Sequence, residues 1–333
     1  MYKKGLLSVC CLGYKHAAFA AECIKSIWNN DYKNIEIIAC DDGSNDGTIE
    51  ILKELQVQSP CPFEIIEQEN TANIGMNFNR CTAKAQGEFI TYIALDDFYT
   101  EDAFSTKLNI MQQDEKIAFI YSAHINIKHE DGSIKANNTS SITKPTIDEL
   151  YEKEYNNGTF ALQGNIFRKE IVDIVNGFDE DLLGDDIILR TKIIQFMYKN
   201  RNWSFEIVNT PAVIYRRHDN NISKNGTRLI LTHLQCYDRY WKDKDYPKFM
   251  LELFTFFISQ FHYSEFLKIA AKHPRLIETI ANNDDFALCI RCNMEKNLKP
   301  KKLLYNIAHY EKKRMDKTSL VIFNKIKIGL KRR

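Results

Sequence analysis

Two adjacent aspartates, Asp96 and Asp97, follow directly after a mostly apolar run, Phe89–Leu95. The run is rich in β-branched and aromatic residues, which is typical of a buried strand. In open α/β sheets, ligands bind just beyond the carboxyl ends of the strands. Neighbouring carboxylates repel each other unless a cation or a hydrogen-bond donor lies between them. The pair therefore predicts a divalent cation shared with substrate phosphates, although an acidic turn or helix cap has the same composition.

Two earlier runs also end in residues suited to binding a polar ligand. Leu6–Leu12 is followed by Gly13-Tyr14-Lys15-His16, and Ile35–Cys40 is followed by Asp41-Asp42-Gly43-Ser44. Neither run alternates between apolar and polar residues, which is typical of parallel strands covered on both faces. Helical periodicity lies between the runs. The sequence therefore predicts a doubly wound α/β fold with a mostly parallel sheet and helices on both faces.

Beyond Asp97 the alternation of strands and helices becomes irregular. The residues from Ala136 to Tyr155 are polar and predict loops, and from Arg228 onward the pattern is helical and rich in aromatic residues. Three further strands are expected, over Ala118–Ile127, Thr159–Phe167 and Glu206–Tyr215. We therefore expect an α/β domain over residues 1–225 and a helical C-terminal region with a basic tail over residues 226–333.

The overall charge is close to zero and does not indicate a nucleic-acid partner. The chain of 333 residues has 45 Lys and Arg against 44 Asp and Glu, and 44% of its residues are hydrophobic, enough for a large core. No run reaches the roughly 18 apolar residues that a transmembrane helix needs. The short apolar run after Lys4 is followed by a poor signal-peptide cleavage site. The sequence therefore predicts a cytoplasmic protein.

The nine cysteines do not form a recognisable disulfide framework. Their number is odd, their spacing is irregular, and several lie in apolar runs, where a free thiol behaves as a small buried hydrophobic group. Cys289 and Cys292 form a C-x-x-C pair without a second pair. This favours a pair on a helix over a zinc or redox site.

Several segments, taken in order, resemble the motifs of family 2 glycosyltransferases, which have the GT-A fold. The resemblance extends over roughly residues 5–223, and it is the ordered set of segments that carries it. The matching segments are Ser8–His16, Tyr32–Ile38, Asp41–Thr48, Asn73–Gly75, Asn79-Arg80, Gly87–Ile90, Asp96-Asp97, Gly177–Glu180, Asp185-Asp186 and Tyr215–His218.

The resemblance implies an inverting transfer of a hexose or N-acetylhexosamine from a UDP-sugar to a hydroxyl of a glycan or lipid-linked glycan. The product would be a bacterial surface polysaccharide, such as O-antigen, lipooligosaccharide or capsule. The family also implies Mn²⁺ or Mg²⁺, which stabilises the growing charge of the leaving diphosphate as a Lewis acid. The acceptor hydroxyl is a poor nucleophile and requires a general base.

Four residues at the strand ends match donor-binding and metal-binding positions of the family. Tyr14 matches the aromatic residue that stacks on the nucleotide base, and Asp42 matches the carboxylate that accepts a hydrogen bond from the base. Asp96 would contact the ribose or the metal, and Asp97 would ligate the metal between the two phosphates. The alternatives are a core tyrosine for Tyr14 and a helix-capping residue for Asp42.

The same resemblance assigns four further residues. Asn73 and Arg80 lie in matching segments and are expected to contact the nucleotide-sugar. Asp186 matches the general base, although Asp185-Asp186 also fits the acidic first turn of a helix. His218 is expected to ligate the metal or to donate to phosphate, with an ordinary surface histidine as the alternative.

One position departs from the family pattern. The usual signature has a third aspartate two residues before Asp96, where this chain has Ala94, so fewer carboxylates would hold the metal. Two alternative functions stay open. One is a nucleotidyltransferase, although Gly13-Tyr14-Lys15 matches poorly the Gly-rich, basic phosphate loop of that class. The other is a nucleotide-sugar-binding or scaffold protein of the same fold, which binds without turnover.

The last 39 residues are strongly basic, with 13 Lys or Arg and 3 Asp or Glu. Within them, apolar residues from Leu320 to Leu330 alternate with Lys325, Lys327 and Lys331. This pattern predicts peripheral contact with an anionic membrane surface, which would suit a lipid-linked acceptor. The alternative is a solvated helix that packs one face on the protein.

Overall fold

The computed structural model describes residues 2–136, 142–184, 186–219, 221–222, 225–259 and 263–282. Asp185, the Cys289–Cys292 pair and the basic tail from Glu295 lie outside the described residues. The chain divides into two compact units, Met1–Ile222 and Ser223–Arg333.

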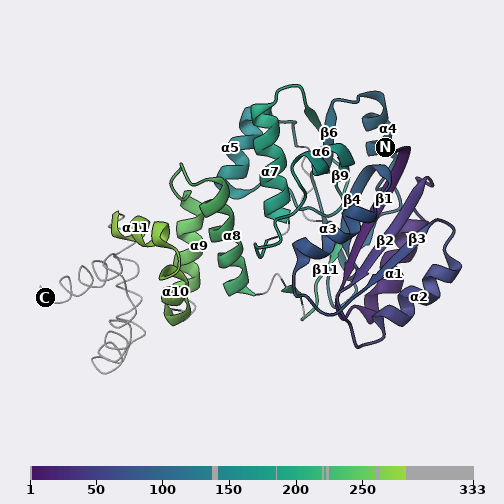
Figure 1. The fold of residues 1–333 in the computed structure, drawn as a ribbon, viewed down its shortest axis with the longest axis horizontal. Coiled ribbons are helices and arrows are strands. Elements are labelled where there is room, and N and C mark those ends of the chain that lie inside the picture. The colour runs from purple at the N-terminus through teal and green to yellow at the C-terminus, as the bar shows by residue number, and fades with distance from the viewer. Residues whose placement is uncertain are drawn as a thin grey trace, which may run out of the picture. The chain divides into compact units, whose positions relative to one another are not determined.

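A seven-stranded sheet forms the centre of the N-terminal unit (Figure 1). Its strands lie in the order β10-β6-β9-β4-β1-β2-β3. Their bounds are β1 Lys3–Gly13, β2 Ile35–Asp41, β3 Phe63–Glu67, β4 Gly87–Ala94, β6 Ile117–Ser122, β9 Ile166–Arg168 and β10 Ser204–Val208. All neighbours pair in parallel except β9, which runs antiparallel to β4 and β6. The predicted α/β fold with a mostly parallel sheet is confirmed.

Strands β1, β2 and β4 are the buried centre of this sheet, as the absence of alternation in their sequences predicts. Every residue of β2 is buried, and so is β1 from Leu6 to its end. The register places Gly13 opposite Asp41 and Leu12 opposite Ala94. The three strands therefore end at one edge of the sheet, and the loops that follow them begin side by side.

Helices cover both faces of the sheet. Three pack on one face, namely α1 Ala17–Trp28, α2 Thr48–Gln58 and α4 Ser105–Gln113. Four pack on the other, namely α3 Ile74–Lys84, α5 Ile147–Asn157, α6 Lys169–Ile174 and α7 Asp186–Lys199. In α1 the buried residues recur at helical spacing (Ala20, Cys23, Ile24 and Ile27), so a single stripe of the helix meets the sheet.

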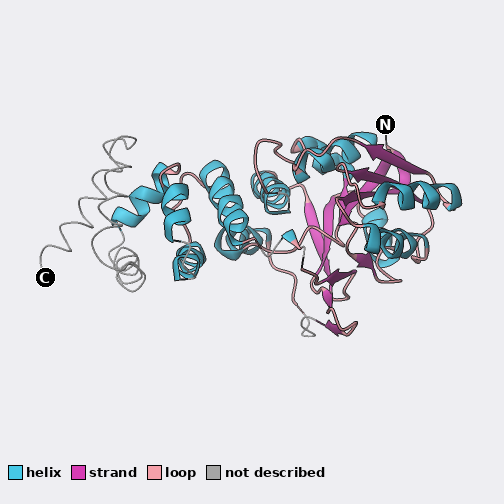
Figure 2. Ribbon diagram, turned by 90° about the horizontal axis from the view of Figure 1, so that it is seen from below, coloured by secondary structure: helices cyan, strands magenta, loops and turns pink. Residues whose placement is uncertain are grey.

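Two of the predicted strands are divided between two sheets. The strand expected over Ala118–Ile127 is β6, followed after a break by β7 Asn126–Lys128. The strand expected over Glu206–Tyr215 is β10, followed beyond Pro211 by β11 Val213–Arg216. Strands β7 and β11 belong to a second sheet, in the order β5-β11-β7-β8, with β5 Phe98–Tyr99 and β8 Ile134–Ala136 (Figure 2). This sheet places β11 against the chain that follows Asp97.

The prediction of loops over Ala136–Tyr155 is wrong for its second half, which forms α5. Thr146 caps this helix by accepting a hydrogen bond from the Glu149 amide, and the Glu149 carboxylate accepts one from the Thr146 amide at 2.7 Å. This reciprocal capping box has the sequence signature Thr-x-x-Glu, which is the signal that reveals the helix. The strand expected over Thr159–Phe167 is also shorter than predicted, since only its end belongs to β9.

The described part of the C-terminal unit is helical, as expected. It contains α8 Gly226–Tyr240, α9 Lys248–Ser259, α10 Tyr263–Ala270 and α11 Pro274–Asn282. Aromatic residues form its interior, and Tyr237, Trp241 and Phe254 are at most 3% exposed. Among the helices of the described residues, none has the length and apolar character needed to span a membrane.

Loss of the capping box is expected to weaken the fold without unfolding it. Thr146→Ala leaves one amide at the start of α5 without its partner, which typically costs about 1 kcal/mol in the free energy of unfolding. Urea denaturation of the purified protein measures this change. Thr143→Ala, at an exposed position just before the helix, is the matched control and should change stability by less than about 0.5 kcal/mol. Equal effects of the two substitutions would contradict the assignment.

Candidate active site

The loops after β1, β2 and β4 meet at the carboxyl edge of the sheet, as the sequence predicts. The Leu95 amide donates to the Leu12 carbonyl at 2.8 Å, and the Asp42 amide donates to the Gly13 carbonyl at 2.9 Å. These two bonds continue the sheet ladder for one residue beyond the strands. They place Asp42 and Asp96 on loops that leave the same edge.

Asp96 and Asp97 are buried at this edge, with exposed fractions of 8% and 1%. The Arg216 amide donates to Asp97 Oδ1 at 2.7 Å. Asp97 Oδ2 and Asp96 Oδ1 are buried and have no hydrogen-bond partner. Burial, together with the neighbouring Asp96 carboxylate, raises the pKa of Asp97 to about 7. The pair is therefore short of positive charge and of hydrogen-bond donors.

Arg216 holds the end of β11 against the aspartates. Its Nε donates to the Asp96 carbonyl at 2.9 Å, and its guanidinium pairs with Glu22 at 2.5 Å. The guanidinium also lies over the rings of Phe19 and Phe98, with centroid distances of 4.8 and 5.2 Å. Arg216 is therefore committed to these contacts and acts as a clamp.

Two histidines flank Asp96. His218 Nε2 lies 3.0 Å from Asp96 Oδ2, and His16 Nε2 lies 3.7 Å from the same oxygen. His218 therefore contacts Asp96 rather than Asp97, its partner in the predicted metal site. Burial lowers the pKa of His16, although Asp96 opposes this effect, and His16 Nδ1 is buried without a partner. The sequence placed His16 in the loop after the first strand but did not predict its contact with Asp96, because only the fold brings the two together.

The aspartate pair fits a divalent cation. Each of the two carboxylates has one buried oxygen without a partner, and hard cations take oxygen ligands. Within the described ranges, no cluster of three or more His, Cys, Asp or Glu side chains could hold a metal ion by itself. Mg²⁺ and similar ions are commonly held by one or two carboxylates and completed by substrate phosphates. Asp97 and Asp96 suit a cation of this shared kind, with His218 beside them.

Asp42 is part of a tightly bonded loop next to this pair. Its Oδ1 accepts hydrogen bonds from the amide and the hydroxyl of Thr71, at 2.8 and 2.9 Å, and from Gln68 at 3.0 Å, while its Oδ2 accepts one from the Ala72 amide at 3.0 Å. Burial disfavours the charge, but these hydrogen bonds outweigh it and lower the pKa of Asp42. Three of these four donors bond to Oδ1 and one bonds to Oδ2, so Oδ2 can accept a further hydrogen bond, such as one from a base N–H.

Tyr14 is 43% exposed, and its loop is hydrogen-bonded to the segment that follows β2. The Lys15 amide donates to Ser44 Oγ at 2.8 Å, and the His16 amide donates to Thr48 Oγ1 at 2.9 Å. The only close contact described for the Tyr14 ring is the Lys15 amine, 5.2 Å from its centroid. The tyrosine is thus not in the core, and its ring is accessible for stacking.

The turn after β2 depends on two specific residues. Asp41 accepts a hydrogen bond from the Ser44 amide at 2.8 Å, which fixes the turn. Gly43 has a φ of +73°, and a Cβ at this position would lie 2.6 Å from the Asn70 amide nitrogen. Glycine is therefore required where the two loops pass each other.

Asn73 and Arg80 make contacts within the chain. Asn73 caps α3 by accepting from the Met76 amide at 2.9 Å, and it donates to the Glu180 carbonyl at 2.6 Å. Arg80 donates to Gln68, which in turn donates to Asp42. Gln68 was missed by the sequence analysis, because no local pattern marks a side chain that links two loops. Asn73 thus fixes the start of α3, and Arg80 supports the loop of Asp42 through Gln68.

Asp186 begins α7, and its side chain is 42% exposed. Its Oδ1 accepts a hydrogen bond from the Ile187 amide at 2.6 Å, and its Oδ2 lies 3.8 Å from the Arg190 guanidinium. Arg190 is fixed in turn by the fully buried carboxylate of Glu154, at 2.7 Å. The acidic first turn expected of a helix is present, and one carboxylate oxygen faces a cation that the core holds in place.

Gln163 connects the loop before β9 to the aspartates. Its Oε1 accepts a hydrogen bond from the Ala94 amide at 3.3 Å, and its side chain also lowers the pKa of Asp97, against the larger effect of burial. Ala94 occupies the position where the family pattern has an aspartate. The sequence gave no signal for Gln163, because its contact depends on the antiparallel insertion of β9.

Substitution of Asp97 should change how stability depends on pH. Since folding raises the pKa of Asp97 from 3.8 to about 7, the native state holds this proton more tightly than the unfolded chain. The resulting stabilisation is complete below about pH 4 and is lost as the pH rises through about 7. Asp97→Asn cannot ionise, so without metal or nucleotide it should gain stability over the wild type by on the order of 2–4 kcal/mol between about pH 4 and pH 8.

Urea denaturation in EDTA at the two pH values measures this difference. Asp148→Asn is the control, because the exposed Asp148 has its pKa lowered by Arg201. That variant should show no such gain. A constant difference between Asp97→Asn and the wild type across the pH range would contradict the raised pKa.

Comparison with known proteins identifies the family and the fold of this chain. The family model for glycosyl transferase family 2 matches residues 8–174. The chain is 28% identical to the GalNAc(5)-diNAcBac-PP-undecaprenol beta-1,3-glucosyltransferase of Campylobacter jejuni, over 73% of this chain and 78% of the relative. Two solved structures share the fold. Staphylococcus aureus TarS 1-349 in complex with UDP-GlcNAc has a TM-score of 0.57, with 13% identity over 98% of this chain and 91% of the other.

The second is the mannosyltransferase PcManGT from Pyrobaculum calidifontis in complex with GDP-Man and Mn²⁺. It has a TM-score of 0.51, with 16% identity over 95% of this chain and 86% of the other. These likenesses confirm the predicted GT-A architecture of the fold, and the family match includes the ends of β1, β2 and β4, where the buried aspartates lie. This chain is therefore a member of glycosyltransferase family 2.

Proposed function

We propose that this glycosyltransferase moves a hexose or N-acetylhexosamine from a UDP-sugar to a hydroxyl of a lipid-linked glycan during synthesis of a bacterial surface polysaccharide. The observation that carries the proposal is the buried Asp96–Asp97 pair, with its two unpartnered oxygens, at the sheet edge beside the accessible Tyr14. The relative from Campylobacter jejuni is a glucosyltransferase that acts on an undecaprenol-linked glycan, and the structure of TarS contains UDP-GlcNAc.

The donor would lie with its base on Tyr14 and its diphosphate toward Asp96 and Asp97. Asp42, Asn73 and Arg80 would then fix the loop that borders the base. A bound Mn²⁺ or Mg²⁺ would act as a Lewis acid toward the diphosphate, as in the family in general. The chain would contribute the ligand oxygens of Asp97 and Asp96, and His218 would orient Asp96 through their 3.0 Å contact.

Asp186 would act as the general base of the transfer. As the acceptor oxygen attacks the anomeric carbon, its proton passes to the Asp186 carboxylate, and the bond from the sugar to the diphosphate breaks. Attack from the face opposite the diphosphate inverts the anomeric centre. Asp186 suits this role because one oxygen is held by the Ile187 amide and the side chain is still partly exposed to an incoming substrate.

A cytoplasmic enzyme at the membrane surface would suit a lipid-linked acceptor. The proposed contact is through the basic tail, which lies outside the described residues. Co-sedimentation of the full chain and of a chain lacking residues 315–333 with anionic liposomes tests this part of the proposal. Equal binding of both chains would remove the tail from this role.

Binding of the donor should depend on the metal. In calorimetric titration we expect UDP to bind in the presence of Mn²⁺ and to bind at least tenfold more weakly in EDTA, since the diphosphate and the aspartates would otherwise repel each other. Asp97→Asn should lose most of the effect of the metal. Binding that is equal with Mn²⁺ and EDTA would contradict the metal role of Asp97, and no binding of UDP would contradict the donor.

The chemical step should depend on Asp186. Asp186→Asn should lower the rate of UDP release from the preferred UDP-sugar, with a bacterial lipid extract as acceptor source, by roughly 10²–10⁴-fold, the usual contribution of a general base. Binding of UDP should be unchanged, because Asp186 contacts the acceptor.

The matched control is Asp148→Asn, which removes an exposed ion pair with Arg201 just before β10, at the opposite edge of the sheet. This variant should retain wild-type transfer, since such pairs contribute little. Full transfer by Asp186→Asn would remove Asp186 from the role of base. Binding of UDP without any transfer by the wild type would favour the non-catalytic alternative.

A further inference from the structure

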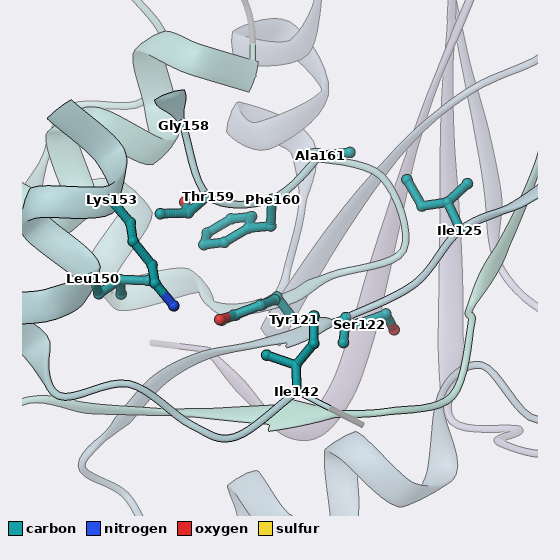
Figure 3. Close-up of a pocket in the computed structure, with 11 residues that line it drawn as sticks. Tyr121, Ser122, Ile125, Ile142, Leu150, Lys153, Gly158, Thr159, Phe160 and Ala161 are labelled. Atoms are coloured by element: carbon teal, nitrogen blue, oxygen red, sulfur yellow. The ribbon is translucent and has the colours of Figure 1, made fainter. Parts of the chain in front are cut away.

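A cavity of about 260 Å³ lies at the end of β6, apart from the aspartate pair. Its walls come from Tyr121 and Ser122 at the end of β6, from Leu150 and Lys153 of α5, and from Phe160 in the loop before β9 (Figure 3). The volume is close to the lower end of the range for small-molecule sites. It suits a group of the size of one sugar ring.

The topology places this cavity at the same edge of the sheet as the aspartates. Strand β9 runs antiparallel both to β4 and to β6, so β4 and β6 point in the same direction. Their carboxyl ends, at Ala94 and Ser122, therefore lie at one edge. The loop that lines the cavity at Phe160 and Ala161 continues to Gln163, which contacts the Ala94 amide.

Arg190 joins the cavity to the proposed general base. Its guanidinium donates to the Phe160 carbonyl, lies 5.8 Å from the centroid of the Phe160 ring and approaches Asp186 Oδ2 at 3.8 Å. Gly158, with a φ of +73°, allows the backbone to lie close to Arg190, because a Cβ at this position would be 2.7 Å from the same guanidinium. A ligand in the cavity would thus be one arginine side chain away from Asp186.

The cavity has one cationic side chain in its lining. Lys153 presents an ammonium group, which only donates hydrogen bonds, and Tyr121 presents a hydroxyl, which can donate or accept. The described lining residues include no Asp, Glu, Asn or Gln, the side chains that usually accept hydrogen bonds from the hydroxyls of a neutral sugar. Figure 3 shows Lys153 and Tyr121 extending into the space that the lining residues enclose.

The carboxylates near the cavity are already committed. Glu154 accepts hydrogen bonds from Arg190, Thr159 and Thr191, at 2.7 to 2.8 Å, and its side chain is fully buried. Glu149, one turn before Lys153, accepts from the Thr146 amide in the capping box. The lining residues therefore contribute one positive charge and no negative charge. The Phe160 ring, stacked on Tyr121 with centroids 4.6 Å apart, adds a rigid aromatic wall.

We propose that this cavity binds the terminal unit of the acceptor and selects a sugar-sized unit that carries an anionic group, a carboxylate or a phosphate. The anionic group meets Lys153 and the Tyr121 hydroxyl, and the carbon skeleton packs on Phe160 and Leu150. The reacting hydroxyl is then directed toward Asp186. This inference rests on the proposed function, because it names the class of acceptor that the same enzyme uses.

The test measures binding of three probes to the full chain loaded with UDP and Mn²⁺, by saturation-transfer difference NMR. The probes are methyl β-D-glucuronide, glucose 6-phosphate and the neutral methyl β-D-glucoside. We expect at least one anionic probe to bind roughly tenfold more tightly than the neutral one, as one charge-assisted hydrogen bond allows. Preference for the glucuronide identifies a carboxylate, and preference for the sugar phosphate identifies a phosphate.

Substitutions locate the binding. Lys153→Met should abolish the roughly tenfold preference, Lys153→Arg should keep most of it, and Lys199→Met, at an exposed lysine of α7 that does not line the cavity, should leave it unchanged. Lys153 is exposed, so its variants are expected to fold. Equal binding of neutral and anionic probes, or a preference that survives Lys153→Met, would overturn the inference.

The proposed function has a separate readout in the same samples. UDP binding by Lys153→Met should equal that of the wild type, because Lys153 does not lie among the donor residues. Failure of UDP to bind the wild type would count against the proposed donor. Normal UDP binding without selective binding of an anionic probe would count against the acceptor class alone.

Discussion

The repulsion between two buried carboxylates is the constraint around which this candidate active site is built. Asp96 and Asp97 lie side by side at a strand end with little access to water. Two negative charges so close together in such a place cost free energy. The fold offsets only part of this cost, through the Arg216 amide and the Gln163 side chain near Asp97 and through His218 on Asp96. The remaining two oxygens have no partner in the described residues, so a cation that arrives with a diphosphate would complete the site.

The second sheet fixes the orientation of Arg216, which clamps the end of β11 beside the aspartates. An arginine this close to two carboxylates would neutralise them if its guanidinium pointed at their oxygens. Instead Glu22 and the rings of Phe19 and Phe98 hold the guanidinium, and only the backbone amide faces Asp97. Strand β11 fixes that orientation by pairing with β5 and β7. The second sheet thus leaves the aspartate oxygens free of the guanidinium and able to receive a metal.

Residues that end buried strands could be predicted from the sequence, and residues that join distant loops could not. The apolar runs before Tyr14, Asp42 and Asp96 fix the strand ends, because parallel strands buried on both faces show no alternation. The contact of His16 with Asp96 depends on how α1 packs, and that of Gln163 with Ala94 depends on the antiparallel β9. Nothing within a few residues of either side chain encodes these contacts. The helix α5 differs from both, since its capping box is a local signal.

The buried ion pair of Glu154 with Arg190 fixes the geometry between Asp186 and the cavity wall at Phe160. Such a pair contributes little net stability, because desolvation of the two charges cancels much of their attraction, but removal of one partner is costly. Its value here is positional: Glu154 on α5 fixes Arg190 on α7, and Arg190 reaches both Phe160 and Asp186. The cavity wall and the proposed base are therefore held by the same guanidinium. A shift of α5 that alters the cavity would also move Asp186, so under the proposed function this one contact would couple acceptor binding to proton transfer.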